Sequence, residues 1–198
     1  MAKFDLSSVA GVIHNGQQVN GVYLNGVLVA DFTSTGEQVT YEQVALNDLA
    51  TDDEVIIVFE NRDDLSYWAM RNDEVTSAGP VVTQVSIDGN IGDQASISTN
   101  SENLNWVIEV YDGYYYFRTK DSDEYLQAGP DTNQGITISK SKSYINHLQW
   151  RCDDYLLSSY GHYLYVRSNY SDVKRATSIT SNVQKTGKVY IFKRVIEV

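Results

Sequence analysis

Two identical Ala-Gly-Pro tripeptides stand 50 positions apart and mark an internal repeat, the first beginning at Ala78 and the second at Ala128. A second match supports the period: Trp106 and Trp150 each open a stretch of strand-forming residues and lie 44 positions apart. The apolar run 55–59 lies about 50 positions before Trp106. Self-similarity at such a period indicates a repeated supersecondary unit. The pattern predicts three copies, each with about four short strands, filling residues 54–198.

Four short strands cannot bury their own apolar face, so the three units are expected to close around a shared core. The simplest closure is a β-trefoil, a barrel capped by three hairpins, with Trp106 and Trp150 in equivalent buried positions. A β-sandwich is the alternative, because it also has short strands at regular spacing; the threefold period favours the trefoil. Fifteen tyrosines and only two prolines suit an all-β chain.

The N-terminal segment has a different pattern and predicts a small β-meander over residues 1–32. Asn15-Gly16 and Asn25-Gly26 interrupt runs of β-branched and aromatic residues, and Asn-Gly supplies the two positive-φ positions of a type I′ hairpin turn. Such a short meander is unstable alone in water, so it must pack on its own second domain, on copies of itself or on another protein. The residues expected to dock are Val12, Val19, Val22, Leu24 and Val29. Residues 33–53 are polar and acidic and are interpreted as a connector.

The charge distribution excludes some partners. The net charge is −11, and most of the acidic excess lies in the first half of the chain. Duplex nucleic acid is not an expected partner, since phosphate binding needs clustered Lys and Arg. No apolar run has the length of a membrane span, and no signal pattern opens the chain, so we expect neither membrane insertion nor export. The single cysteine, Cys152, allows no internal disulfide.

The sequence contains no motif that predicts an enzyme, a cofactor or a metal site. No nucleophile elbow is present, and the three histidines have no partner spacing typical of a catalytic base. The acidic stretches 121–124 and 131–135 resemble calcium loops only faintly, because neither follows the twelve-residue ligand pattern. We interpret them as turns.

Aromatic residues around the expected turn at Asp112-Gly113 provide one candidate ligand site. Sugar C–H faces stack on aromatic rings, and sugar hydroxyls bond to carboxylates. Asp112 with Tyr114 or Tyr116 could therefore contact a glycan. The competing interpretation is that the tyrosines alternate along a strand and half of them pack in the barrel.

Two resemblances follow from these segments. The stretch VIHNGQQVNGVYLNGVLVAD (12–31) resembles a short module near the N-termini of tailed-phage virion proteins. The remainder resembles trefoil-like modules of gut Bacteroidota surface proteins and of their phages, through Trp106-Val107-Ile108, Tyr163-Leu164-Tyr165, Arg175-Ala176 and the segment 189–194. Together they imply a structural component of a crAss-like phage virion, an auxiliary capsid, head-fibre or tail-associated protein.

That resemblance implies a non-enzymatic protein assembled in the host bacterial cytoplasm and carried in the virion. Its partners would be other virion proteins, above all the capsid shell, to which the N-terminal strands dock. The alternative hypothesis is a carbohydrate-binding adhesion module that recognises glycans of the host surface.

Overall fold

The computed structural model divides the chain into two compact units, Met1–Gln38 and Val39–Val198. We call the second unit the body. The structure describes residues 12–14, 17–19, 21–24, 27–31, 38–61, 64–76, 79–120, 122–128, 136–140, 145–153, 156–159, 162–167, 175–179 and 188–196. Side chains are described from residue 38 onward, except those of residues 145, 152–158, 162, 167 and 175–179.

The N-terminal unit contains two separate two-stranded antiparallel sheets, β1–β2 and β3–β4. In both sheets the innermost paired residues are separated by two residues, which is the connection predicted from the two Asn-Gly pairs. The second sheet also contains a register shift, between Val22 and Tyr23. The strands are β1 (Val12–His14), β2 (Gln17–Val19), β3 (Gly21–Leu24) and β4 (Val27–Asp31).

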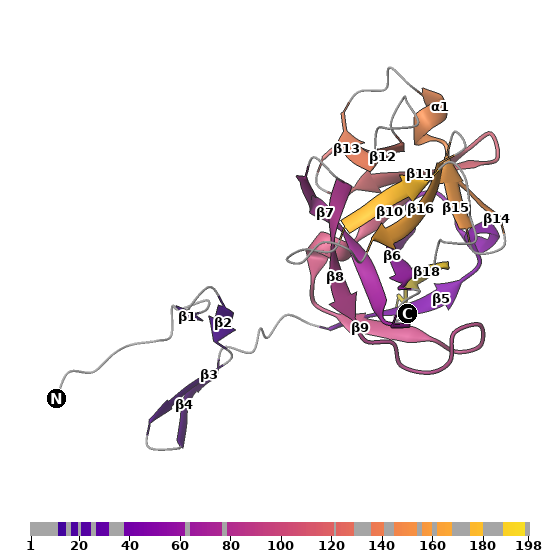
Figure 1. The fold of residues 1–198 in the computed structure, drawn as a ribbon. Coiled ribbons are helices and arrows are strands. Elements are labelled where there is room, and N and C mark those ends of the chain that lie inside the picture. The colour runs from indigo at the N-terminus through magenta and orange to yellow at the C-terminus, as the bar shows by residue number, and fades with distance from the viewer. Residues whose placement is uncertain are drawn as a thin grey trace. The chain divides into compact units, whose positions relative to one another are not determined.

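The body is all-β, as predicted, and its described strands form one 14-stranded sheet (Figure 1). The early strands and helical turns are β5 (Val39–Val44), η1 (Leu46–Asp48), β6 (Glu54–Glu60), β7 (Tyr67–Thr76), β8 (Gly79–Val85), β9 (Ser96–Thr99) and η2 (Glu102–Leu104). The later ones are β10 (Trp106–Tyr111), β11 (Tyr114–Thr119), β12 (Tyr125–Ala128), β13 (Ile136–Ser139), α1 (Ile145–Leu148), β14 (Arg151–Asp153), β15 (Leu156–Ser159), β16 (His162–Arg167), β17 (Arg175–Ile179) and β18 (Val189–Arg194).

Three antiparallel meanders build the sheet, and each follows a short helical turn. They are β6–β7–β8 after η1, β10–β11–β12–β13 after η2, and β14–β15–β16–β17 after α1. The first meander pairs with the second through β6 and β10, and with the third through β8 and β17. A bridge between Tyr115 and Trp150 joins the second meander to the third. The strand order therefore closes on itself, which matches a trefoil-like barrel better than two stacked sheets.

Both tryptophans predicted to be buried are fully buried. The indole Nε1 of Trp106 donates to the main-chain oxygen of Met70 at 3.2 Å, and that of Trp150 donates to Leu126 at 3.0 Å. A buried indole N–H without an acceptor would be costly, so these bonds hold each ring in one orientation. Trp106 thus links β10 to the first meander, and Trp150, just before β14, links the third meander to the second.

Strand β6 is buried on both faces, which explains its unbroken apolar sequence. Its Val55, Ile57 and Phe59 belong to the main core, whereas Ile56 and Val58 belong to a second cluster with Tyr41 of β5 and Ile97 of β9 among its members. The domain boundary predicted at residue 54 therefore lies at Val39 instead. The segment 39–53, expected to be part of a connector, includes β5, which pairs with β18 and β9 and covers the second face of β6.

Candidate functional site

The turn between β10 and β11 has the geometry predicted for it. Tyr111 and Tyr114 pair across the hairpin, and the two residues between them have positive φ, 51° at Asp112 and 74° at Gly113. Two successive positive φ values in a two-residue connection define a type I′ turn. Asp112 lies exposed at this end of the hairpin, which we call the tip.

The tip does not assemble the predicted sugar platform. Tyr116 is only 7% exposed, and its hydroxyl accepts a hydrogen bond from Gln149 at 3.1 Å. The guanidinium of Arg151 lies over the ring of Tyr114, 5.2 Å from its centroid. Of the three residues proposed from sequence, only Asp112 is freely exposed; the exposed ring beside it is Tyr111, at 71%. The interpretation that strand tyrosines pack in the body holds for Tyr116.

The predicted docking residues Val12, Val19, Val22, Leu24 and Val29 all lie within strands of the N-terminal unit. Their side chains lie outside the described part of the structure. Their role in docking therefore stays a prediction.

A polar cleft of about 360 Å³ lies at the other end of the β10–β11 hairpin. Strand β11 runs from the tip to this cleft, and its six residues span about 17 Å. The described residues that line the cleft are all polar or charged: Asn72, Asp73, Glu102, Asn103, Thr119, Lys120, Ser122 and Glu124.

A bulge in β7 brings Asn72 and Asp73 to the cleft. Met70 pairs with Val82, and the next pair in the register is Val75 with Pro80. The chain thus advances five residues along β7 but only two along β8. The three additional residues must leave the plane of the sheet. Bulges commonly reorient side chains beside functional sites.

Asp73 is held by the arginine two residues before it. Arg71 donates through Nε and through a second nitrogen, both at 2.8 Å, to the two carboxylate oxygens of Asp73. This bidentate bond lowers the pKa of Asp73 below its ordinary value of 3.8. Asn103 approaches the same carboxylate at 3.5 Å. The cleft therefore presents an ionised carboxylate in a fixed orientation.

Glu54 of β6 organises the cleft from behind. Its carboxylate accepts hydrogen bonds from Asn105 at 2.6 Å and Arg194 at 2.7 Å, and it pairs with the Lys120 ammonium at 3.2 Å. Burial alone would raise the pKa of Glu54, but the hydrogen bonds from these three donors outweigh burial and lower the pKa below 4.5. Asn105 in turn accepts a bond at its main-chain oxygen from Asn72, at 2.6 Å. Two cleft residues, Lys120 and Asn72, are thus positioned through one partly buried carboxylate.

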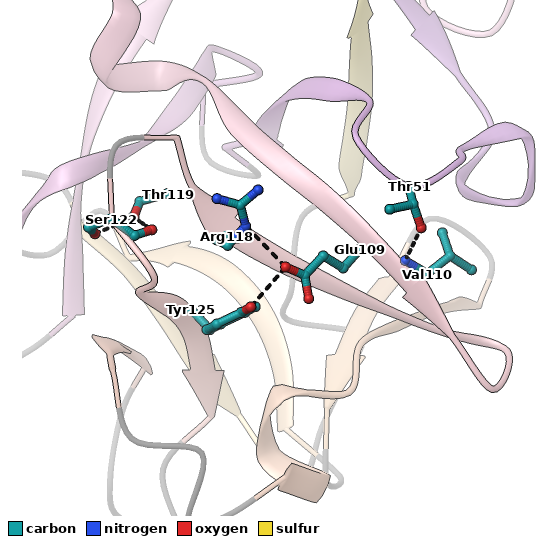
Figure 2. Close-up of polar contacts among 7 residues, drawn as sticks. All are labelled: Thr51, Glu109, Val110, Arg118, Thr119, Ser122 and Tyr125. Atoms are coloured by element: carbon teal, nitrogen blue, oxygen red, sulfur yellow. Dashed lines mark hydrogen bonds and ion pairs between the residues drawn. The ribbon is translucent and has the colours of Figure 1, made fainter.

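The turn after β11 supplies the hydroxyl groups of the cleft. The hydroxyl of Thr119 donates to the main-chain oxygen of Ser122 at 2.8 Å and lies 2.6 Å from its hydroxyl, as Figure 2 shows. Ser122 also donates to the carboxylate of Glu124 at 3.0 Å. These local bonds hold the three oxygen-bearing side chains of Thr119, Ser122 and Glu124 together at the edge of the cleft.

One buried atom beside the cleft lacks a partner. The side-chain oxygen Oδ1 of Asn105 has no hydrogen-bond partner among the described residues, although Asn105 is only 3% exposed. The bond to Glu54 fixes the orientation of the amide, because only the NH₂ group can donate to a carboxylate. Oδ1 is therefore an acceptor that still lacks a donor.

Sequence reasoning missed the cleft because its residues come from four separate segments. None of Glu54, Asn72, Asn103 or Lys120 belongs to a recognisable motif, and the bulge that exposes Asp73 depends on pairing with β8. The available signal was the acidic, amide-rich stretch 72–74 inside an otherwise apolar strand pattern.

No group of three or more His, Cys, Asp or Glu side chains in the described part of the chain lies close enough together to hold a metal ion. The described helices include none that is both long and apolar enough to span a membrane.

Comparison with known proteins finds similarity in structure alone. No protein-family model matches the chain, and no curated protein matches it in sequence. One similar solved structure is the C-terminal domain mutant of an earthworm lectin in complex with 6′-sialyllactose, at TM-score 0.45 and 12% identity, covering 72% of this chain and 99% of that one. Another is a Caenorhabditis elegans protein with unknown function, at TM-score 0.44 and 16% identity, covering 74% and 97%. Similarities at this level establish neither a shared family nor a shared ligand.

Proposed function

We propose that the body is a non-enzymatic carbohydrate-binding module and that the polar cleft is its binding site. The observation that carries this proposal is the lining of the cleft, whose described residues supply carboxylates, amides, hydroxyls and one ammonium, with no apolar side chain among them. A sugar presents hydroxyl groups that both donate and accept, and it needs partners of both kinds at fixed positions. A lipid or an aromatic ligand needs apolar walls instead.

The rigidity of the lining supports the same proposal. Arg71 fixes Asp73, Glu54 fixes Lys120, and Asn105 fixes Asn72. Pre-positioned polar groups lower the entropy cost of binding. Because the described part of the lining contains no aromatic ring, we expect affinity for a single sugar to be weak and to increase with repeated units.

A glycan array followed by calorimetry on the best ligand tests the proposal. Asp73→Asn should weaken binding strongly, because the amide is uncharged and can no longer pair with Arg71. Asp93→Asn removes the same charge at an exposed position outside the cleft and should bind as the unmodified protein does. Retained affinity in Asp73→Asn, or no binding to any glycan, would contradict the proposal.

We also propose that the N-terminal unit docks the body onto a larger assembly, for which the resemblance of residues 12–31 to tailed-phage modules suggests a virion. The supporting observation is that residues 1–38 form a compact unit of their own, whose described strands pair as two-stranded sheets. Isolated hairpins are marginally stable in water, so a partner surface would stabilise them.

The docking proposal is tested in the full-length chain with Gly26→Val. Valine disfavours the positive φ that an Asn-Gly turn needs, which should weaken the second hairpin. We expect reduced co-purification with capsids while the melting of the body stays unchanged. Normal incorporation of Gly26→Val into particles would show that this hairpin is not the anchor.

A further inference from the structure

The charges of the cleft come from different walls. Asp73 belongs to the β7 bulge, Glu102 to η2 and Glu124 to the segment just before β12. Lys120 is the single cation among the lining residues that the structure describes. Three carboxylates against one ammonium give this lining a net charge of −2.

The surrounding ion pairs do not cancel this excess. Behind the lining, Glu54 and Glu74 are anions, and Arg71 and Arg194 are cations. These outer charges sum to zero. The ammonium of Lys120 is already bound to Glu54 and is not free for an anionic ligand. Among the described residues, neither Glu102 nor Glu124 has a cationic partner.

The side-chain oxygen of Asn105, an acceptor without a donor among the described residues, also favours a cationic ligand. Asn105 adjoins the cleft, because Asn72 of the lining donates to its main-chain oxygen and because it shares Glu54 with Lys120. Its Oδ1 needs a donor, which an ammonium group supplies and a carboxylate group does not. An acceptor without a donor therefore lies beside a lining that is short of positive charge.

We propose that the preferred ligand of the cleft is an amino sugar with a free amine, rather than an N-acetylated or an acidic sugar. The inference rests on the proposed carbohydrate-binding function and names its substrate class. The ammonium group would lie between the carboxylates of Glu102 and Glu124, and the hydroxyl groups would bond to Asp73, Asn103 and Ser122. Acidic sugars would be repelled by the net negative lining.

Three probes at pH 6, where a primary amine is protonated, separate the classes. They are the β-1,4-linked tetrasaccharide of glucosamine, its fully N-acetylated counterpart and 6′-sialyllactose. Calorimetry should show the glucosamine tetrasaccharide binding at least about fivefold tighter than the acetylated one, the factor that one partly exposed ion pair of about 1 kcal/mol supplies. Sialyllactose should bind weakest. Raising the salt concentration should reduce the preference for the amine.

A charge-neutral double variant tests the assignment to this site. Glu102→Gln with Glu124→Gln keeps the size of both side chains and removes their charge, so the double variant should bind the glucosamine and acetylated tetrasaccharides with equal affinity. Glu42→Gln with Asp93→Asn removes two charges from exposed positions outside the cleft and should keep the preference.

The outcomes distinguish this inference from the function on which it rests. Equal or tighter binding of the acetylated sugar, or an amine preference that survives in the Glu102 and Glu124 double variant, overturns the inference alone. Binding of none of the three probes, together with a negative glycan array, overturns the carbohydrate-binding function and this inference with it.

Discussion

The two ends of the β10–β11 hairpin differ in how they are built. The tip is a two-residue turn whose shape depends on Asp112 and Gly113 themselves. The cleft end is assembled from the β7 bulge, η2, the turn after β11 and, behind them, Glu54 and Arg194. Both ends display carboxylates and hydroxyls, and the cleft end arranges its polar groups around a space of about 360 Å³.

The difference shows that an exposed aromatic beside an acid is a weak indicator of a binding site. At the tip, Tyr114 and Tyr116 share one face of β11, but Tyr116 is buried in the body and Tyr114 lies beneath Arg151. At the cleft end, long-range hydrogen bonds hold polar side chains in position, and none of the described lining residues is aromatic. The predictions below test this contrast, beginning with the largest effect.

The two buried tryptophans, one at each end of the hairpin, should make the largest contributions to the free energy of unfolding. Trp106 pairs with Thr119 at the cleft end, and Trp150 bridges Tyr115 near the tip. Truncating either to Ala should cost about 3–5 kcal/mol of unfolding free energy, measured by urea denaturation. Exposed Tyr111→Ala is the control and should cost less than about 0.5 kcal/mol.

Hydrogen exchange then separates the two tryptophan variants. Trp106→Ala should speed exchange first at the amide of Thr119, and Trp150→Ala first at that of Tyr115, which donates to Trp150. Identical exchange patterns would mean that the hairpin responds as one unit and that the contrast between its ends is wrong.

The carboxylates Glu54 and Glu109 allow a second test. Glu54→Gln should cost about 2 kcal/mol and weaken glycan binding, since it removes the charge that holds Lys120 and Arg194. Glu109 lies along the hairpin, where it accepts bonds from Arg118 at 3.1 Å and Tyr125 at 2.8 Å (Figure 2). Its side chain is 37% exposed against 22% for Glu54, so Glu109→Gln should cost about 1 kcal/mol or less and leave binding unchanged.

Acid should destabilise the cleft end selectively. The folded pKa values of Glu54 and Asp73 both lie below their ordinary values of 4.5 and 3.8. As the pH falls, these groups therefore take up protons in the unfolded chain before they do so in the folded protein. The stability that they contribute is present above about pH 4.5 and is lost as the pH falls through their folded pKa values. Thermal melts from pH 7 to pH 3 should fall less steeply in Glu54→Gln than in the unmodified protein; parallel curves would contradict the role of Glu54.

The smallest effect is expected at the tip. Asp112→Ala keeps a side chain at positive φ and should cost about 1 kcal/mol or less, whereas Asp112→Gly should be neutral or slightly stabilising. Neither change should alter glycan affinity in calorimetry. If Asp112→Ala lost glycan binding while its melting stayed unchanged, the binding site would lie at the tip and not in the cleft.

Much of the fold could be predicted from sequence because its signals are local or periodic. The Asn-Gly pairs indicated the two-residue connections, and the spacing of Trp106 and Trp150 indicated the repeated meanders. The role of β5 could not be foreseen, because half of its residues are polar and it lies in a polar, acidic stretch. Only the unbroken apolar run of β6 shows that a second covering layer is required. The cleft was beyond sequence reasoning for a related reason: Glu54 and Arg194 are 140 residues apart and meet only in the closed sheet.

The position of β18 has a consequence for biosynthesis. It pairs with both β5 and β6, so one side of each of these earliest strands of the body finds its partner only after residue 194 has left the ribosome. Until then the apolar β6 has an unpaired edge in the nascent chain, which is a template for aggregation. A premature stop codon anywhere before β18 should therefore yield an insoluble product rather than a smaller working domain, and a slow codon run upstream of residue 189 should increase dependence on chaperones.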